Sequence, residues 1–340
     1  MGNEPISPGL SPELLQLALR LEGIFMPQAR RQRIEAGFGD EQIRTPIRFA
    51  HYTSADAALK IIRSKRMWMR NTTCMSDYHE VSRGLKILQS FFSDKAKTDS
   101  FIAALDACSP GVASEAIGNF NRQWNNVSLG TYVTSISEHD DKEDLHGRLS
   151  MWRAFGGNTG SARVAIVFRV PRFSAGTIAL NLIFSPVAYL TEEEAHKVMH
   201  EVIHNIGQSC DFLRTVPRLT LLNTVFIMFL AAAVCLKHEG FREEREWRGI
   251  HCPKLIPSSL MEFGTEVVAG VPQIVYKLPL DVSVAPALAD LDFTQMFDRL
   301  IIGPSPYPWV MYEAFVAALK EAGCPDHDNR VWNSNIPIRT

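Results

Sequence analysis

The pattern of a folded sheet begins at Ile47-Arg48-Phe49-Ala50-His51-Tyr52-Thr53-Ser54. β-Branched and aromatic residues over 47–52 predict a strand. Ser54 stands before Ala55 and Asp56 in the arrangement of a helix N-cap, which predicts a helix that continues to Ile62. The pair His51-Tyr52 therefore lies where a strand ends and a capped helix begins.

Downstream of this stretch, helical and strand patterns follow one another irregularly. We predict helices over 77–92, 95–107, 111–125, 191–213, 217–238 and 309–322, and strands over 129–137, 164–168, 245–251, 265–277, 299–302 and 331–338, with one or two more between 178 and 190. This mixed order predicts an α+β fold rather than a regular βαβ array. Residues 46–340 are interpreted as one elaborated domain. Residues 1–45 are interpreted as an N-terminal helical extension, in which Ser11 caps a helix that starts at Pro12.

Composition limits the classes of function. Hydrophobic residues make up 46% of the 340, and 35 Lys and Arg against 37 Asp and Glu give a net charge of −2. This balance excludes a broadly basic nucleic-acid coat but not a local basic groove, for which Arg30, Arg31 and Arg33 are the candidates. The six cysteines form no C-x-x-C pair and are expected to be free thiols. We expect a cytoplasmic protein, since the N-terminus does not read as a signal peptide.

The most apolar segment, residues 219–236, contains no charged residue. Its length is at the lower limit for a membrane span, which usually needs about 20 residues. Thr220, Asn223 and Thr224 lie inside it. We therefore predict a central helix buried in the core, and no stable membrane association.

A metal-binding pattern occurs at His200-Glu201-Val202-Ile203-His204, which spells H-E-x-x-H. On a helix the two histidines share one face and could bind zinc, with Glu201 as base. Cys210, however, stands where a third histidine is expected, and His196 extends the row into a polar stripe. We favour a solvated helix face and expect no metal; a zinc hydrolase stays a lesser alternative.

Four separated motifs are more consistent with one another than the parts of the zinc pattern are. They are Phe49-Ala50-His51-Tyr52-Thr53-Ser54; Met75-Ser76-Asp77-Tyr78-His79-Glu80, which follows Met67-Trp68-Met69; Val133-Thr134-Ser135-Ile136-Ser137 together with Met151-Trp152-Arg153-Ala154-Phe155-Gly156-Gly157; and Lys237 followed by Phe241-Arg242-Glu243-Glu244-Arg245-Glu246-Trp247-Arg248. In this order they resemble an uncharacterised bacterial family, a domain of unknown function that shows H-Y-T-S, N-D-x-x-E, S-F-S, M-W-x-x-Y-G and E-x-E-W-R. The resemblance runs from about Ile47 to the C-terminus. Ser76 replaces the usual Asn, and Phe155 replaces the usual Tyr.

The layout of that family in turn resembles the ADP-ribosyltransferase-like superfamily. The resemblance implies a split mixed or antiparallel sheet with inserted helices, on which NAD is bound as a substrate. By this analogy His51 bonds the nicotinamide-side ribose, and Ser135 or Ser137 lines the nicotinamide pocket. The analogy also allows Tyr52 or Trp152 to stack on the ring. The remaining residues of the implied NAD site are Thr53, Phe155 and Arg248.

The late acid of the superfamily corresponds to Glu246, or to Glu244 two residues before it. Loss of nicotinamide leaves positive charge on the ribose, which a fixed carboxylate stabilises. A strand through Glu244 and Glu246 would place both acids on one face, where their repulsion should raise the pKa of one of them. Each residue also has a structural interpretation: His51 as a satisfied strand-end histidine, Trp152 as core, and the acidic run as a salt-bridged surface.

The resemblance implies an NAD-dependent ADP-ribosyltransferase, or an NAD glycohydrolase, in a toxin or defence setting. Its acceptor would be an unknown macromolecule, either protein or nucleic acid. A non-catalytic module that binds a nucleotide or a partner protein on the same fold is the alternative from a different class.

The interpretation of 196–204 as a solvated helix face predicts that the purified protein carries no stoichiometric zinc. Elemental analysis of wild type and His200→Ala measures this directly. One zinc per chain that is lost in His200→Ala would restore the metal-site interpretation.

Overall fold

The computed structural model describes residues 11–38, 47–74, 78–154, 162–171, 174–268 and 270–337. Within these ranges ten strands form one sheet, with the path β12-β11-β4-β1-β3-β2-β10-β9 and a branch in which β8 pairs with β3 and β5 pairs with β8. The strands are β1 (Ile47–Ser54), β2 (Arg66–Asn71), β3 (Tyr132–Glu138), β4 (Arg163–Val170), β5 (Ile183–Pro186), β8 (Glu246–His251), β9 (Glu262–Val268), β10 (Val271–Pro279), β11 (Phe297–Ile302) and β12 (Val331–Asn333). All pairs are antiparallel except β11–β12. The predicted α+β class with a mixed sheet is confirmed.

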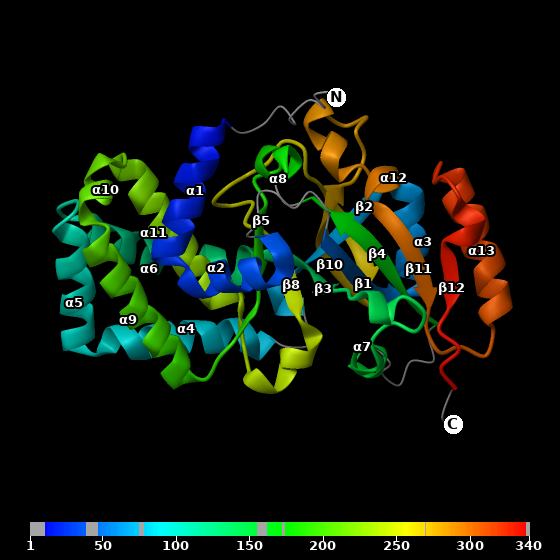
Figure 1. The fold of residues 1–340 in the computed structure, drawn as a ribbon, viewed down its shortest axis with the longest axis horizontal. Coiled ribbons are helices and arrows are strands. Elements are labelled where there is room, and N and C mark those ends of the chain that lie inside the picture. Colours follow the sequence, from blue (N-terminus) through cyan, green and yellow to red (C-terminus); the bar gives the residue numbers. More distant parts are fainter. Residues whose placement is uncertain are drawn as a thin grey trace.

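Helices gather on one side of this sheet, which gives the molecule a helical half and a sheet half (Figure 1). The helical half contains α1 (Pro12–Phe25), α2 (Pro27–Arg33), α4 (Tyr78–Ser93), α5 (Lys95–Asp106), α6 (Val112–Gly130), α9 (Glu192–Gln208), α10 (Cys210–Thr215) and α11 (Arg218–Val234). The sheet half carries α3 (Ala55–Ser64), α7 (Leu149–Ala154), α8 (Ala175–Ala179), α12 (Phe293–Met296) and α13 (Pro308–Glu321). Two short strands form a separate parallel pair. In the sequence, β6 (Ala188–Tyr189) lies between β5 and α9, and β7 (Leu236–Lys237) lies between α11 and β8.

Local capping signals predicted two helix starts correctly. Ser11 Oγ accepts a hydrogen bond from the Leu14 N–H, and Pro12 is the first helical residue of α1. Ser54 Oγ accepts from the Ala57 N–H at the start of α3. Both caps satisfy backbone N–H groups that have no partner inside the helix.

Several predicted boundaries were wrong. Helix α6, predicted to end at 125, continues to Gly130, so β3 begins at Tyr132 rather than at 129. The helix predicted over 191–213 is two helices, α9 and α10, which meet at Ser209, and the helix predicted over 217–238 ends at Val234.

The stretch 265–277 is two strands, β9 and β10, because Gly270 adopts a left-handed φ of 80° that allows the chain to turn. The strand expected over 245–251 begins one residue later, at Glu246. The last strand, β12, ends at Asn333 rather than continuing to 338. Strand β2 was not predicted.

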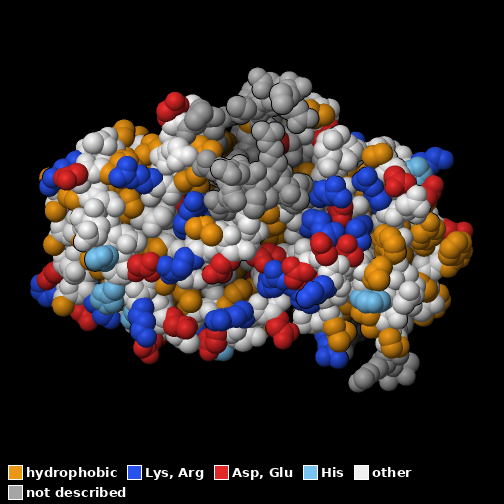
Figure 2. All heavy atoms as spheres, in the orientation of Figure 1, with side chains coloured by type: hydrophobic (Ala, Val, Ile, Leu, Met, Phe, Trp, Pro, Cys, Tyr) orange, Lys and Arg blue, Asp and Glu red, His pale blue; other side chains and the backbone are white. Residues whose placement is uncertain are grey.

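Residues 219–234 of the apolar segment lie in α11, the central helix of the helical half, whereas Leu236 belongs to β7. Phe229, Leu230 and Val234 of α11 are buried, whereas Leu219 at its start is 68% exposed. Within the described ranges no helix combines the length and apolarity needed to cross a bilayer. Charged side chains of both signs are interspersed over the face seen in Figure 2, in keeping with the net charge of −2. All six cysteines are free.

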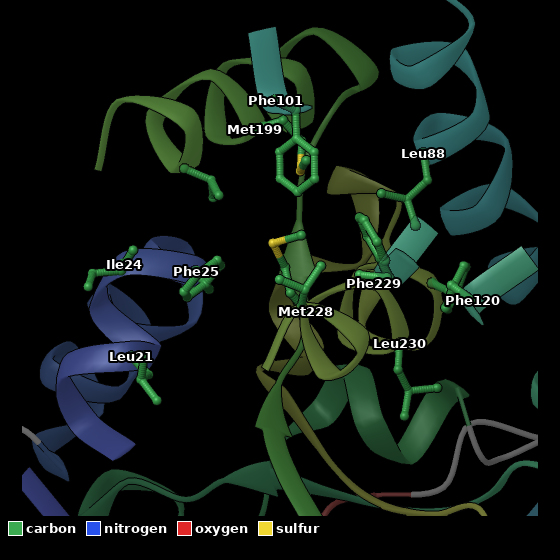
Figure 3. Close-up of a cluster of buried hydrophobic side chains, with 14 of the residues drawn as sticks. Leu21, Ile24, Phe25, Leu88, Phe101, Phe120, Met199, Met228, Phe229 and Leu230 are labelled. Carbon is green, nitrogen blue, oxygen red and sulfur yellow. The ribbon is translucent and has the colours of Figure 1, made fainter. Parts of the chain in front are cut away.

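The largest hydrophobic core fills the helical half and includes the N-terminal helices (Figure 3). Leu21, Ile24 and Phe25 of α1 contribute to the same buried cluster as Phe229 of α11. A second core lies between the sheet and helices α3 and α13. Helix α1 therefore shares the core of the helical half.

Helices α4 and α11 touch backbone to backbone at Gly84. A Cβ atom at this position would lie 2.5 Å from Ala233 O and 2.6 Å from Ala232 O, so only glycine allows the contact.

We expect Gly84→Ala to lower the free energy of unfolding by about 1–3 kcal/mol, because overpacking outweighs the ~1 kcal/mol that Ala gains in helix propensity. Gly23→Ala in α1 is the control, since nothing lies within 4 Å of its added Cβ. Thermal unfolding should show opposite shifts for the two variants, and a stabilised Gly84→Ala would contradict the close contact.

Candidate functional site

The sheet is split at β3. β1 pairs with β3 only at Phe49↔Glu138 and Ala50↔Ser137, whereas β2 pairs with it only at Arg70↔Val133 and Asn71↔Tyr132. Between these two contacts the edge of β3 over 134–136 has no described strand partner on this side. We call this interval the split.

His51 bridges the split. Its Nδ1 lies 2.9 Å from the carbonyl oxygen of Ser135. Because a carbonyl only accepts, Nδ1 carries the proton and Nε2 is the ring's acceptor. Burial lowers the pKa of His51, and this outweighs the opposite effect of the Ser135 carbonyl. The ring is therefore neutral at pH 7.

On the other edge of β3, Ser135 meets the strand that carries the late acid. Ser135 Oγ donates to Glu246 Oε1 at 2.5 Å. Arg248 donates to the same carboxylate from Nε at 2.8 Å and from Nη2 at 3.1 Å. Lys237 Nζ lies 3.5 Å from Glu246 Oε2 and 2.7 Å from Glu244 Oε2. We refer to Ser135, Lys237, Glu244, Glu246 and Arg248 as the Glu246 cluster.

The cluster lies largely inside the protein: Glu246 is 6% exposed and Arg248 is 2% exposed. Burial alone would raise the pKa of Glu246, but the charge of Arg248, its hydrogen bonds, Lys237 and Ser135 lower that pKa to about 2. Burial raises the pKa of Glu244. The charge and hydrogen bond of Lys237 offset only part of this rise, and repulsion from Glu246 adds to it. The two neighbouring acids thus differ in proton affinity, and Glu246 is ionised at neutral pH.

Glu244 does not lie on the strand face that was predicted for it. It ends a 3-10 helix over Glu239–Glu244, and Arg245 then takes a left-handed φ of 46°. The Arg245 guanidinium pairs with Glu138 and Asp140, which hold this turn in place. Lys237, not strand geometry, brings the two acids together.

The predicted aromatic residues are used in packing. The Tyr52 hydroxyl accepts a hydrogen bond from the Arg148 N–H at 2.7 Å, and its ring meets Trp152 edge-on at 4.8 Å. Trp152 Nε1 donates to His146 O at 2.7 Å. Both rings belong to a small buried cluster with Met151. As placed, each ring is engaged with the core and is not open to a stacked ligand.

Ser137 is the cross-strand partner of Glu246 in the β3–β8 ladder, but neither it nor Thr53 is hydrogen-bonded to the Glu246 carboxylate. Ser137 is buried, and its Oγ lies 3.9 Å from Met151 Sδ. Thr53 is half-buried in the part of β1 that pairs with β4. Phe155 lies outside the described residues, as do Ser76 and Asp77.

The H-E-x-x-H residues lie on α9, far in the sequence from β8. His200 and His204 are exposed, and the His200 ring rests against Phe91 at 5.4 Å. Glu201 Oε1 is 2.6 Å from Arg31 Nη1, an ion pair that joins α9 to α2. Across the described part of the chain, no group of three or more His, Cys, Asp or Glu could hold a metal ion.

Lys237 of the Glu246 cluster and its neighbour Tyr189 were not among the predicted site residues. Lys237 stood in the fourth motif without a role, and its position as a charge buried directly after the apolar run of α11 was a usable signal. The Tyr189 hydroxyl accepts from the Glu246 N–H at 2.9 Å. No sequence signal pointed to Tyr189, since the contact joins residues 57 apart.

A family model described as a protein of unknown function, DUF2971, matches residues 151–249. This segment runs from α7 to β8 and includes Trp152, Glu246 and Arg248. Within it, the expectation of an uncharacterised domain family is confirmed. His51 and Ser135 precede the matched segment. No curated protein and no solved structure matches the chain.

Acid should weaken the fold through Glu246. Its folded pKa of about 2 lies below its ordinary value of 4.5, so the unfolded state binds more protons between these values. The stabilisation is complete above about pH 5 and is lost as the pH falls toward about 2.

We expect Ser135→Ala to lower the free energy of unfolding at pH 7 by about 1–3 kcal/mol, because a charged acceptor loses a buried donor. The pKa of Glu246 should then rise toward its ordinary value, so the variant should lose less stability in acid than wild type and the difference between them should shrink as the pH falls. Ser137→Ala is the matched control, since its hydroxyl meets only a weak acceptor. Denaturant titrations between pH 7 and pH 3 test this; equal losses in both variants would contradict the assigned hydrogen bond.

Proposed function

We propose that this protein cleaves the bond between nicotinamide and ribose in NAD and transfers ADP-ribose to a macromolecular acceptor or to water. The observation that carries the proposal is the chain of contacts across the split sheet. His51 bonds to Ser135, and Ser135 bonds to Glu246, so that residues from β1, β3 and β8 meet at one place. By the superfamily resemblance, His51, Ser135 and Glu246 are the residues that contact NAD.

The chemistry suits these groups. In the cleavage step the bond from ribose C1′ to the nicotinamide nitrogen breaks, and nicotinamide leaves as a neutral molecule with the electron pair. The ribose becomes positively charged, and the ionised Glu246 is matched to that charge. The oxygen of the acceptor or of water then bonds to C1′ and releases its proton. Glu244, whose pKa is raised by burial, is suited to take that proton.

In the proposed reaction the ribose reaches the carboxylate past His51 and Ser135, which is supported by the half-burial of these two residues where Glu246 is buried. In the proposed reaction His51 offers a neutral imidazole to the ribose hydroxyls. Glu246 exchanges its weaker cationic contact, the 3.5 Å contact with Lys237, for the charged sugar. Lys237 keeps its closer partner Glu244.

The complete pairing of Glu246 favours one alternative. A buried carboxylate already neutralised by Arg248 and Lys237 is also what a structural ion cluster requires. On this alternative the protein is a non-catalytic module that binds a nucleotide or a partner protein.

Incubation with NAD labelled in the nicotinamide ring should release labelled nicotinamide. We expect Glu246→Gln to reduce the rate by about a hundredfold or more, as loss of a charge-stabilising group does elsewhere. Glu266→Gln is the matched control, because Glu266 pairs with Lys277 on β9–β10. His51→Gln tests the same site if loss of the Glu246 charge disturbs folding.

Equal nicotinamide release from wild type and from both site variants would contradict the proposed roles. Absence of release together with absence of calorimetric NAD binding would reject the function. A nucleotide-dependent rise in melting temperature without turnover would establish the non-catalytic alternative.

A further inference from the structure

Arg70 of β2 carries a positive charge that no acid neutralises among the described residues. Its guanidinium donates from Nε to Gln273 Oε1 at 3.2 Å and from Nη2 to Cys74 O at 2.6 Å, and both acceptors are neutral. Burial lowers the pKa of Arg70, and the group that opposes this effect is the Cys74 thiol rather than a carboxylate. Because an arginine side chain stays protonated in proteins, the charge is present and uncompensated.

The other arginine on this face of β2 is compensated. Arg66 Nη2 lies 3.4 Å from Glu262 Oε1, and Arg66 Nη1 lies 3.5 Å from Asp281 Oδ2. Charged groups that are withdrawn from water are usually paired in this way. Arg70 is half-buried and has no such pair within the described part of the chain. It is therefore able to pair with an anion from solution.

The guanidinium of Arg70 is held in place and is reachable. Gln273, which accepts from Nε, is 8% exposed, so a buried amide fixes the orientation of the group. These contacts use two of the five N–H donors of the side chain. Nη1 bonds to no described residue and is not one of their buried polar atoms that lack a partner, so it is accessible to solvent. A guanidinium that is already oriented loses little entropy when it binds an anion.

Arg70 lies on the face of the sheet that carries the Ser135 hydroxyl. Arg70 stands opposite Val133 in the β2–β3 ladder, and opposed residues direct their side chains to the same face. Ser135 follows Val133 by two residues and shares that face because side chains alternate along a strand. Its hydroxyl contacts Glu246. Arg70 is therefore on the face where the proposed reaction places the ribose of NAD.

From the uncompensated charge, the fixed orientation and the position beside the split, we infer that Arg70 binds a phosphate group. The guanidinium fork matches the oxygens of a phosphate, which accept two parallel N–H bonds. Its ligand in the proposed reaction is the diphosphate of NAD. This second statement rests on the proposed function, whereas the phosphate site does not.

Inorganic pyrophosphate and a neutral thiol reagent test the site in the wild-type protein. Cys74 and Cys210 are half-buried free thiols, whereas the other four thiols are buried. Pyrophosphate bound at Arg70 should slow the alkylation of Cys74 by iodoacetamide and leave that of Cys210 unchanged. Mass spectrometry of the two peptides measures both rates. Alkylation of Cys74 at the same rate with and without millimolar pyrophosphate would overturn the site.

ADP and adenosine are a matched pair of ligands, because only ADP carries the diphosphate. By calorimetry we expect wild type to bind ADP about tenfold or more tightly than adenosine, and Arg70→Gln to lose this preference. Arg66→Gln is the control and should retain it, since the charge of Arg66 is already paired. Equal affinity of wild type and Arg70→Gln for ADP would overturn the role of Arg70. The protection of Cys74 in wild type decides the question if Arg70→Gln fails to fold.

Kinetics separate this inference from the proposed reaction. Arg70→Gln should raise the KM for NAD about tenfold with little change in kcat, because the diphosphate is bound equally in the ground state and the transition state. Nicotinamide release with an unchanged KM in Arg70→Gln would reject the role of Arg70 and leave the reaction standing. Binding of ADP that depends on Arg70, without nicotinamide release by wild type, would reject the reaction and support the phosphate site.

Discussion

The buried ion pair of Glu246 and Arg248 is the interaction on which the arrangement of the two halves depends. Arg248 holds the carboxylate with two nitrogens and donates from Nη1 to Val234 O at the end of α11. One guanidinium thus joins the sheet to the central helix, where the C-terminal end of a helix favours a cation. Because both groups are buried, removal of either one would leave a charge without a partner, which costs more than the pair contributes.

That constraint also explains why the site lies where it does. β8 is held against β3 along six residue pairs, whereas β1 and β2 each reach β3 at only two. The β3–β8 ladder and the Ser135–Glu246 hydrogen bond therefore fix one side of β3, whereas on the other side His51 contacts the interval of β3 that has no strand partner among the described residues. Ser135 is the residue common to both sides, through its carbonyl oxygen and its hydroxyl.

Sequence reasoning succeeded where the determining contacts are local. The Ser54 cap and the strand before it follow from neighbouring residues. It failed where contacts with distant residues determine the local structure. The left-handed turn at Arg245 is held by Glu138 and Asp140. Strand β2 pairs with β10, about 200 residues later in the sequence. For the candidate site, the resemblance supplied His51, Ser135 and Glu246. Tyr189 and the joining role of Lys237 depend on tertiary contacts that no short motif encodes.

The position of β3 has a consequence for the order in which the chain assembles. Its three neighbours are β1, β2 and β8, and the Ser135–Glu246 contact spans 111 residues. During synthesis, β3 leaves the ribosome long before β8 exists. Until then its outer edge is unprotected, and closing so long a loop is slow. The candidate site is thus completed only when β8 has been synthesised and has paired with β3, which ties the maturation of the site to a late, long-range contact of the fold.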